Sequence, residues 1–220
     1  MGYQHTMADG AAVALPVGKV VCIGRNYAEH ARELNNEVPS EPLLFMKPSS
    51  ALSTMSEPVK VPRGLGSVHF ETELAILIGE RLSHADEQAA QHAIVGVGLG
   101  LDLTLRDVQE KLKSKGHPWE RAKGFDGACP LSPFLTPASV GDLTDVQLRL
   151  TVNDEVRQDG NSAQMITPIL ALISYISQWF TLEPGDVVLT GTPAGVGALE
   201  PGDKLRVEIV DLLRVDTCAE

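Results

Sequence analysis

Hydrophobic and polar residues alternate in several short stretches, and this alternation predicts a chain rich in β-strands. Apolar stretches bounded by turn residues predict strands at 19–24, 43–46, 68–78, 93–104 and 148–158. In the last of these, leucine and valine alternate with polar residues before an Asn153–Asp154 pair, which predicts a β-hairpin. Residues 51–67 hold prolines and glycines and predict a loop with short extended pieces.

Three other stretches have the composition or the spacing of helices. They lie at 26–36, 104–115 and 165–180, and the last is the most apolar. The pentapeptide LEPGD occurs twice, at 182–186 and at 199–203. Its Pro-Gly pair predicts a turn before a strand in both places.

The predicted strands and helices do not alternate strictly, which favours a single mixed α+β domain over a doubly wound parallel sheet. The chain has 220 residues, of which 43% are apolar, and this supplies one sizeable core. We expect an N-terminal arm at 1–17, either loose or paired as a short edge strand, followed by one domain at 18–220.

Glycines occupy every second position in the middle of the predicted strand at 93–104. They are Gly96, Gly98 and Gly100, and they leave one face of the strand without side chains. A bare face of this kind predicts the close approach of another backbone or of a ligand.

Glu71 and Glu73 share one face of the predicted strand at 68–78, because side chains two residues apart point the same way. Their carboxylates lie roughly 6.5–7 Å apart along the strand, which is unfavourable unless something compensates the charge. Asp102 ends the next predicted strand and completes a set of three carboxylates. A hard divalent cation prefers such oxygen ligands, although a solvated strand face has the same spacing.

Charge and composition restrict the partners. The formal net charge is −11 and no basic block occurs, which argues against nucleic acid as a partner. A site for small anions must therefore carry its own positive charge. We expect no membrane association, because the apolar stretches are shorter than the ~20 residues that span a bilayer and the N-terminus lacks a signal-peptide pattern. Three scattered cysteines, Cys22, Cys129 and Cys218, suit a reduced, cytoplasmic location.

Seven stretches, in the same order along the chain, resemble the fumarylacetoacetate hydrolase family. They are GRNYAEHARE (24–33), EPLLFMKP (41–48), HFETEL (69–74), LDLTLRDVQ (101–109), WERAKGFDGACP (119–130), VNDEVRQ (152–158) and LTGTPAGVG (189–197). The chain looks most similar to small single-domain members, which include acylpyruvate hydrolases and oxaloacetate decarboxylases. This resemblance implies a β-rich fold of packed, rolled sheets with flanking helices, usually assembled as a homodimer. Residues 210–220 match the last strand of the family poorly.

The resemblance also implies a metal site and a lid. It implies that Glu71, Glu73 and Asp102 hold Mg²⁺ or Mn²⁺, which would compensate the repulsion within the glutamate pair. It further implies that the segment near 26–36 is a mobile lid that orders over bound substrate.

His30 and Glu33 are three residues apart on the predicted helix, so their side chains can touch. The carboxylate would orient the imidazole and raise its basicity, and the resemblance assigns this pair to water activation. Without the resemblance, an ordinary surface pair is the simpler interpretation. Lys123 resembles an electrophile or proton donor near the metal, a role that needs a lowered pKa for proton transfer. A solvated surface lysine is the alternative.

Thr190, Gly191 and Thr192 form a turn after a predicted strand, and exposed N–H groups and hydroxyls there would bind an anion. This turn resembles the substrate-carboxylate site of the family.

Four more residues are candidates for substrate binding. Gln109 resembles a substrate-orienting residue, and Arg106 either joins it or serves as a structural ion-pair partner. Arg25 and Lys47 are further candidates for local positive charge, although Lys47 also precedes Pro48 at the end of a strand.

We therefore expect a divalent-metal-dependent enzyme that acts on small anionic 2-oxo acids. The activity that we favour is hydrolysis of a C–C bond in acylpyruvates or related 2,4-dioxo acids. Oxaloacetate decarboxylation is expected at the same site, because both reactions form an enolate that a metal stabilises. The alternative is an isomerase that reprotonates this enolate, as in keto–enol tautomerisation of oxaloacetate or in a double-bond shift in aromatic catabolism. A catalytically silent metabolite-binding protein is the alternative from another class.

Overall fold

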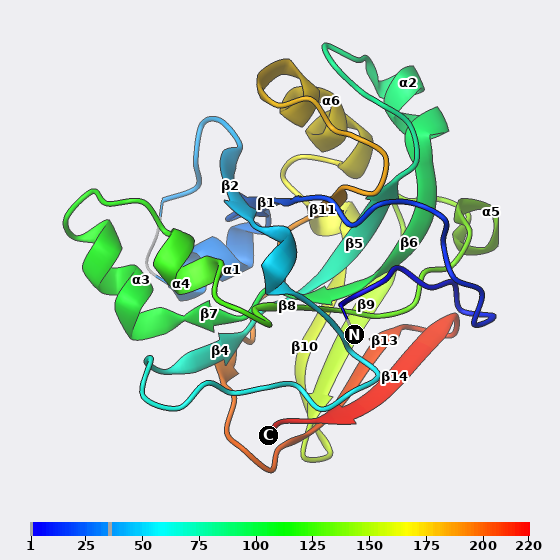
Figure 1. Cartoon of the computed structure of the whole chain (residues 1–220). Coiled ribbons are helices and arrows are strands. Elements are labelled where there is room, and N and C mark those ends of the chain that lie inside the picture. The colour runs from blue at the N-terminus through cyan, green and yellow to red at the C-terminus, as the bar shows by residue number, and fades with distance from the viewer. Residues whose placement is uncertain (1, 35–36) are drawn as a thin grey trace.

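The computed structural model describes residues 2–34 and 37–220 and confirms a mixed α+β fold with curled sheets and few helices (Figure 1). The strands are β1 (Val20–Gly24), β2 (Leu43–Lys47), β3 (Leu52–Thr54), β4 (Val68–Phe70), β5 (Thr72–Ile78), β6 (Ile94–Leu101), β7 (Thr104–Leu105), β8 (Cys129–Leu131), β9 (Gln147–Val152), β10 (Glu155–Asn161), β11 (Val187–Leu189), β12 (Gly197–Ala198), β13 (Lys204–Ile209) and β14 (Leu213–Cys218). The helices are α1 (Ala28–Glu33), α2 (Glu87–Ala93), α3 (Arg106–Lys113), α4 (Glu120–Lys123), α5 (Pro137–Val140) and α6 (Ile169–Trp179), with 3₁₀ turns at Ser49–Ala51 and Ser162–Gln164.

The largest sheet has seven strands in the order β2-β1-β11-β5-β6-β8-β3. It curls so far that its two ends approach each other. Lys47, on the edge strand β2, donates a 3.0 Å hydrogen bond to the carbonyl of Ala128, which directly precedes β8 near the opposite edge. The side chains inside the curl form a small core of their own, separate from the main core.

The three glycines of β6 lie on the inside of this curl. An added Cβ atom would lie 2.9 Å from Ser132 Oγ at Gly98, and 2.6 Å from Leu189 Cδ2 at Gly100. Side chains of neighbouring segments cover most of the bare face predicted from the sequence, and at Gly98 a second backbone also approaches, because the carbonyl oxygen of Pro133 would lie 3.1 Å from an added Cβ atom.

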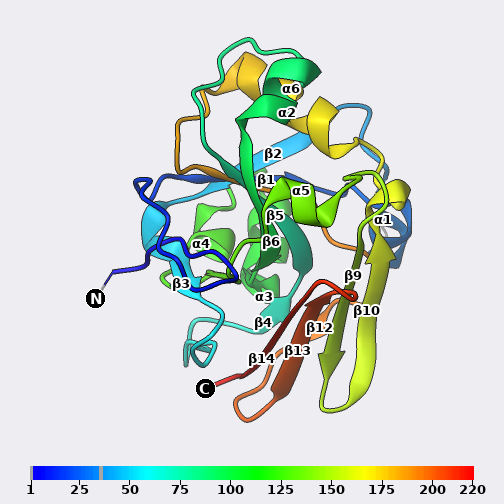
Figure 2. The ribbon, with the colours of Figure 1, turned by 90° about the vertical axis from the view of Figure 1, so that its right-hand side faces the viewer.

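A second sheet has the order β10-β9-β13-β14 and lies below the helices α2 and α6 in Figures 1 and 2. The predicted hairpin is confirmed, because Asn153 and Asp154 link β9 to β10 with φ of 50° and 67°. A register shift between Val156 and Gln158 marks a bulge in β10. Within 210–220, where the match to the family was poor, β14 pairs with β13 over its whole length.

The structure corrects the prediction of one continuous strand at 68–78. β4 pairs with β12 and β7 in a three-stranded sheet, whereas β5 pairs with β11 and β6 in the large sheet. Glu71 lies between β4 and β5, where the chain passes from one sheet to the other. The two glutamates therefore belong to a junction between sheets.

The helices are shorter than predicted. The segment 104–115 begins with β7, and α3 starts only at Arg106. In 165–180 the helix α6 begins after Pro168, which is its N-cap residue and does not lie in its first turn. In 26–36, α1 covers 28–33, while 35–36 fall outside the described residues. Among the described residues, no helix has the length and hydrophobicity needed to cross a bilayer.

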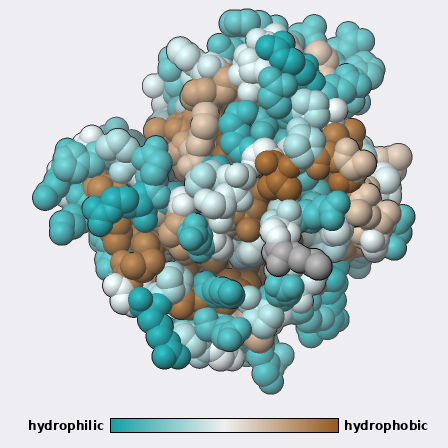
Figure 3. All heavy atoms as spheres, viewed as in Figure 1, coloured by the Kyte–Doolittle hydropathy of each residue, from teal (hydrophilic) through white to brown (hydrophobic). Residues whose placement is uncertain are grey.

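Hydrophilic side chains dominate the α3 side of the molecule in Figure 3. This agrees with the exposure of Glu110 and Lys111 on that helix. On the opposite side of the large sheet, the N-terminal arm packs against the small core through Tyr3, Met7 and Leu15. His5 is fully buried and its Nε2 lies 3.0 Å from the carbonyl oxygen of Gly185.

Both LEPGD segments form the predicted turns. Gly185 and Gly202 have φ of 92° and 98°, as the third residue of a type II turn requires. In each turn the aspartate that follows accepts a 2.8 Å hydrogen bond from the N–H of the preceding glutamate. Asp186 is 2% exposed and also pairs with Lys19, whereas Asp203 is half-buried.

This difference makes the two turns a matched pair for mutagenesis. We expect Asp186→Ala to lower the free energy of unfolding by about 2–3 kcal/mol, because two backbone N–H donors and the Lys19 ammonium lose their buried acceptor. Asp203→Ala removes the same turn contact and should cost clearly less. Chemical denaturation of both variants measures the difference, and equal losses would contradict the role of the Lys19–Asp186 pair.

Candidate active site

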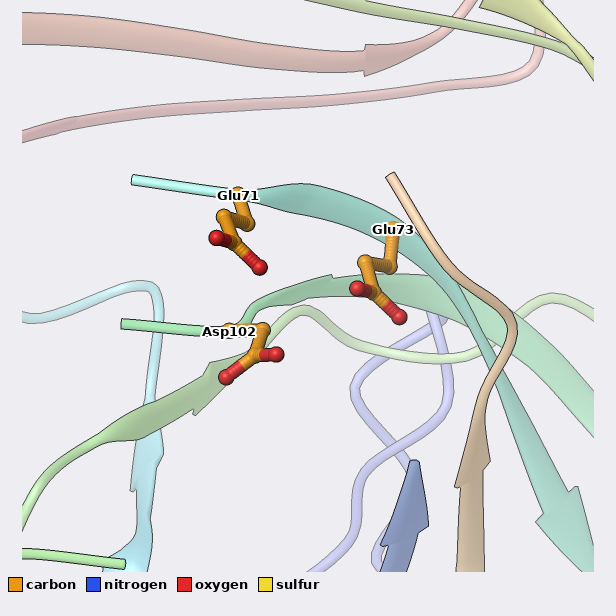
Figure 4. Close-up of side chains that lie close together, drawn as sticks. All are labelled: Glu71, Glu73 and Asp102. Carbon is orange, nitrogen blue, oxygen red and sulfur yellow. The ribbon is translucent and has the colours of Figure 1, made fainter. Parts of the chain in front are cut away.

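Three carboxylates converge where β4 passes into β5 (Figure 4). Glu71 lies between these strands, Glu73 lies in β5, and Asp102 directly follows β6. The three residues each offer one carboxylate oxygen within 4.8 Å of the others. All three side chains are buried, which excludes the alternative of a solvated strand face.

Strand pairing brings these residues together. β5 and β6 are antiparallel neighbours in which Glu73 lies opposite Gly100. Two residues beyond this pair, the N–H of Asp102 donates a 2.8 Å hydrogen bond to the carbonyl of Glu71. Residues separated by about 30 positions in the sequence thus share one end of the same strand pair.

Basic side chains surround two of the three carboxylates. Lys123 Nζ donates to Glu71 Oε2 at 2.9 Å and to Asp102 Oδ2 at 2.6 Å. Arg106 pairs with the other oxygen of Glu71, and Lys47 Nζ lies 2.7 Å from Asp102 Oδ1. Arg106 is therefore an ion-pair partner, one of the two roles left open by the sequence.

Glu73 differs from the other two carboxylates. Its Oε2 accepts a 2.6 Å hydrogen bond from the N–H of Gly191. Within residues 2–34 and 37–220 the structure gives it no ion pair with a basic side chain.

The different surroundings of Glu71 and Glu73 shift the pKa values of the two carboxyl groups in opposite directions. Burial by itself would raise the pKa of Glu71, but Lys123 and Arg106 outweigh it and hold that pKa far below its usual range. Burial, together with the charges of Asp102 and Glu71, raises the pKa of Glu73 well above its usual value.

Lys123 follows the opposite pattern from the one its predicted role requires. Burial acts to lower its pKa, but the charges and hydrogen bonds of Asp102 and Glu71 outweigh burial and raise that pKa. Lys123 is therefore an ammonium ion in this structure. A proton-shuttling lysine would need the lowered pKa that the sequence-based interpretation assumed.

The donor set suits a hard divalent cation. Three buried carboxylates supply only oxygen, the donor that Mg²⁺ and Mn²⁺ prefer. Glu73 forms no ion pair with a basic side chain among the described residues, and a bound cation would offset the burial and the neighbouring negative charges that raise its pKa. The residues present therefore fit a metal ion, and Glu71, Glu73 and Asp102 are the residues that would hold it.

A cavity of about 40 Å³ opens onto these carboxylates, which is room for a few water molecules. Its wall includes most of the residues that the sequence singled out. They are Arg25, His30, Glu71, Glu73, Asp102, Arg106, Gln109, Lys123 and Thr192. Phe45, Lys113 and Trp119 also line it and were not predicted.

The predicted His30–Glu33 contact is present. His30 Nδ1 lies 3.3 Å from Glu33 Oε2, and the N–H of Gly195 donates to Glu33 Oε1 at 3.0 Å. The imidazole is buried at the cavity wall, which argues against an ordinary surface pair. Because Nδ1 faces Glu33, Nε2 is the ring nitrogen left for the cavity.

Three of the predicted substrate-binding residues contact the protein itself. Lys47 is fully buried and donates to the carbonyls of Leu103, Lys123 and Ala128. The hydroxyl of Thr190 donates to a carbonyl of β5 at 3.1 Å, and Gly191 donates to Glu73. A substrate contact for these three residues stays a prediction, and the observed contacts hold Asp102 and β5 in place.

Arg106, Gln109 and Arg25 lie closer to the cavity. Arg106 donates to the side-chain oxygen of Gln109 at 2.7 Å, so the two act as a unit on the first turns of α3. Arg25 follows β1 with φ of 60°, a conformation that costs a non-glycine residue on the order of 1–3 kcal/mol.

Gln158 is a buried residue whose role the sequence did not reveal. Its Oε1 accepts from the N–H of Thr72 at 2.9 Å, and its Nε2 donates to Thr192 Oγ1 and to the carbonyl of Pro193, both at 2.8 Å. The hydroxyl of Thr192 in turn donates to the carbonyl of Thr72 at 2.9 Å. This closed ring fixes the residue between the two glutamates against the turn that lines the cavity. The bulge in β10 turns Gln158 inward, and a bulge leaves no signal in strand alternation.

A family described as "Fumarylacetoacetate (FAA) hydrolase C-terminal" matches residues 19–218 of the chain. The chain belongs to the fumarylacetoacetate hydrolase family.

Relatives within the family are similar over nearly the whole chain. Oxaloacetate tautomerase YcgM of Escherichia coli (strain K12) is 53% identical over 206 residues, which cover 93% of this chain and 94% of that protein. A fumarylacetoacetate hydrolase family protein of Yersinia pestis CO92 has a TM-score of 0.97 at 50% identity, covering 99% of this chain and all of that one. Fumarylpyruvate hydrolase of Pseudomonas aeruginosa, solved with Mn²⁺ and pyruvate, has a TM-score of 0.89 at 35% identity, covering 100% and 97% of the two chains.

The contrast between Glu73 and Glu71 leads to a test of the metal site. We expect Glu73→Gln to leave the free energy of unfolding of the metal-free protein within about 1 kcal/mol of wild type, since the amide keeps the acceptor for Gly191. Glu71→Gln should lower it by about 3 kcal/mol, because Arg106 and Lys123 lose a charged partner.

Both variants should lose the stabilisation that Mg²⁺ or Mn²⁺ gives the wild type, about 2.7 kcal/mol at 100 times the Kd. Thermal unfolding with and without the metal measures both effects. Unchanged metal stabilisation in Glu73→Gln would exclude this carboxylate as a ligand.

Proposed function

We propose that this member of the fumarylacetoacetate hydrolase family is a divalent-metal-dependent oxaloacetate keto–enol tautomerase. The proposal rests on one observation. In this chain, which is 53% identical to the Escherichia coli tautomerase, three carboxylates, Lys123 and His30 line one cavity. The sequence alone placed acylpyruvate hydrolysis first. We reverse this order because the relative with the higher identity is named for tautomerisation and the less similar one for hydrolysis.

A divalent cation held by Glu71, Glu73 and Asp102 would act as a Lewis acid towards the 2-oxo acid. Around it, Lys123 and Arg106 place two positive charges at the cavity wall. These fixed charges favour a substrate that gains negative charge during the reaction. Gln109, held by Arg106, offers its amide group to orient the substrate.

His30 is the group that we assign to proton transfer. Its Nε2 takes the proton from C3 of oxaloacetate, the C3–H electron pair forms the C2=C3 double bond, and the C2 oxygen takes a proton from water, to which the imidazolium then returns one. Glu33 holds the ring through Nδ1 and stabilises the imidazolium that forms. In the reverse direction, the imidazolium returns a proton to C3.

Hydrolysis of acylpyruvates is the second candidate, and the contact of the buried His30 with Glu33 favours it specifically. His30 would take a proton from water, the hydroxide would add to the distal carbonyl, and the C–C bond would break towards pyruvate, whose C3 then takes a proton. The structure of the Pseudomonas aeruginosa hydrolase with Mn²⁺ and pyruvate supports this chemistry for the same fold. We further expect the enzyme to work as a homodimer in the cytoplasm.

The first experiment follows the enol form of oxaloacetate by its ultraviolet absorbance, using metal-stripped protein with and without added Mg²⁺ or Mn²⁺. We expect metal-dependent equilibration of the two tautomers, much faster than the release of pyruvate from oxaloacetate or acetylpyruvate. Folded, metal-loaded protein that leaves tautomerisation at its spontaneous rate would refute the proposal. Rapid pyruvate release from acetylpyruvate in that case would establish the second candidate.

Glu33→Gln tests the assignment of His30. It removes the charge that orients the imidazole, so tautomerisation and any hydrolysis should fall about 100-fold or more. Metal binding, measured by thermal unfolding, should not change because Glu33 does not contact the carboxylate cluster. Glu29→Gln on the exposed side of the same helix is the control and should keep full activity. Wild-type turnover in Glu33→Gln would contradict the assignment.

A further inference from the structure

Positive charge is concentrated at the wall of the cavity. Four basic side chains line it, namely Arg25, Arg106, Lys113 and Lys123. Arg106 and Lys123 contact the metal-binding carboxylates directly. Arg25 and Lys113 reach the wall from elsewhere, Arg25 from the residue after β1 and Lys113 from the last residue of α3.

Lys113 lies close to other positive groups. Burial, followed by the charges of Arg25 and Arg106, lowers its pKa, while Glu110 and Glu71 act in the opposite direction. Cationic side chains that lie close together in a partly buried place repel one another, and a bound anion offsets this repulsion. The left-handed φ of 60° at Arg25 adds strain at the same place, and such strain concentrates at ligand-binding sites.

Substrate chemistry determines which anion fits. A 2-oxo acid would bind a cation held by the three metal-binding carboxylates through its own carboxylate and keto oxygen. In oxaloacetate the far end is a second carboxylate, whereas in acetylpyruvate it is an uncharged ketone. Arg106 and Lys123 pair with the metal-binding carboxylates, and Arg25 and Lys113 line the same cavity. A second carboxylate on the substrate would meet the positive charge of Arg25 and Lys113.

We propose that Lys113, together with Arg25, binds the distal carboxylate of a four-carbon 2-oxo dicarboxylate and so selects it over acylpyruvates with an uncharged end. The assignment rests on the proposed function and names the substrate class of the same site. Arg25 is held by its 3.3 Å hydrogen bond to the carbonyl of Glu37, so it is positioned before the substrate arrives.

The test compares Lys113→Met with a matched control. Lys111→Met removes the same charge from the last turn of the same helix, but Lys111 is exposed and does not line the cavity. In Lys113→Met we expect kcat/KM for oxaloacetate to fall about 10- to 100-fold, as expected for a lost charge-assisted hydrogen bond. Turnover of acetylpyruvate should change little, and Lys111→Met should resemble wild type with both substrates.

A binding measurement separates this inference from the proposed function. Malate and 2-hydroxybutyrate have the same 2-hydroxy acid group and four carbons, and they differ in the distal carboxylate. Calorimetry on Mg²⁺-loaded protein should show that wild type and Lys111→Met prefer malate, and that Lys113→Met loses the preference. Lys113→Arg, which restores the charge, should recover it.

The outcomes are distinct. If wild type does not act on oxaloacetate but Lys113→Met still loses the preference for malate, the proposed function fails and the dicarboxylate site stands. If Lys113→Met keeps the preference for malate, or loses activity equally towards both substrates, the dicarboxylate site is refuted whatever the reaction.

Discussion

Three buried carboxylates with oxygens within 4.8 Å of one another repel strongly unless positive charge lies between or beside them. This requirement explains where the basic residues lie. Lys123 joins Glu71 to Asp102 through one ammonium group. Lys47, on the edge strand β2, pairs with Asp102 and also donates to the carbonyl of Ala128 near the opposite edge, so one side chain both balances the charge of the site and links the two ends of the sheet. Folding and charge compensation are therefore coupled here.

Local pattern was sufficient to predict much of the structure. The hairpin at Asn153–Asp154, both LEPGD turns and the pairing of His30 with Glu33 depend on residues close in sequence, and the structure shows all of them. Glu71 and Glu73 do lie close together as predicted, although Glu71 lies between two strands and not within the one continuous strand from which the prediction was made.

Features that depend on contacts between distant segments could not be predicted from local sequence patterns. The break at Glu71 exists because β4 and β5 pair with strands of different sheets, and those partners lie far along the chain. The burial of Lys47 has the same cause, since its acceptors come from residues 56 to 81 positions away. The raised pKa of Lys123 depends on two carboxylates that only the folded chain brings together.

The glycine at position 100 has a consequence for evolution of the metal site. Gly100 lies opposite Glu73 in the β5–β6 pair and two residues before Asp102. A Cβ atom there would lie 2.6 Å from Leu189 Cδ2 and 3.1 Å from Leu131 Cδ2, so these buried side chains would have to repack beside the strand end that leads to Asp102. The arrangement of the three carboxylates is thus tied to a position that has no side chain of its own. A relative that carries a larger residue at this position would need a compensating smaller residue on the neighbouring strands to keep the same packing.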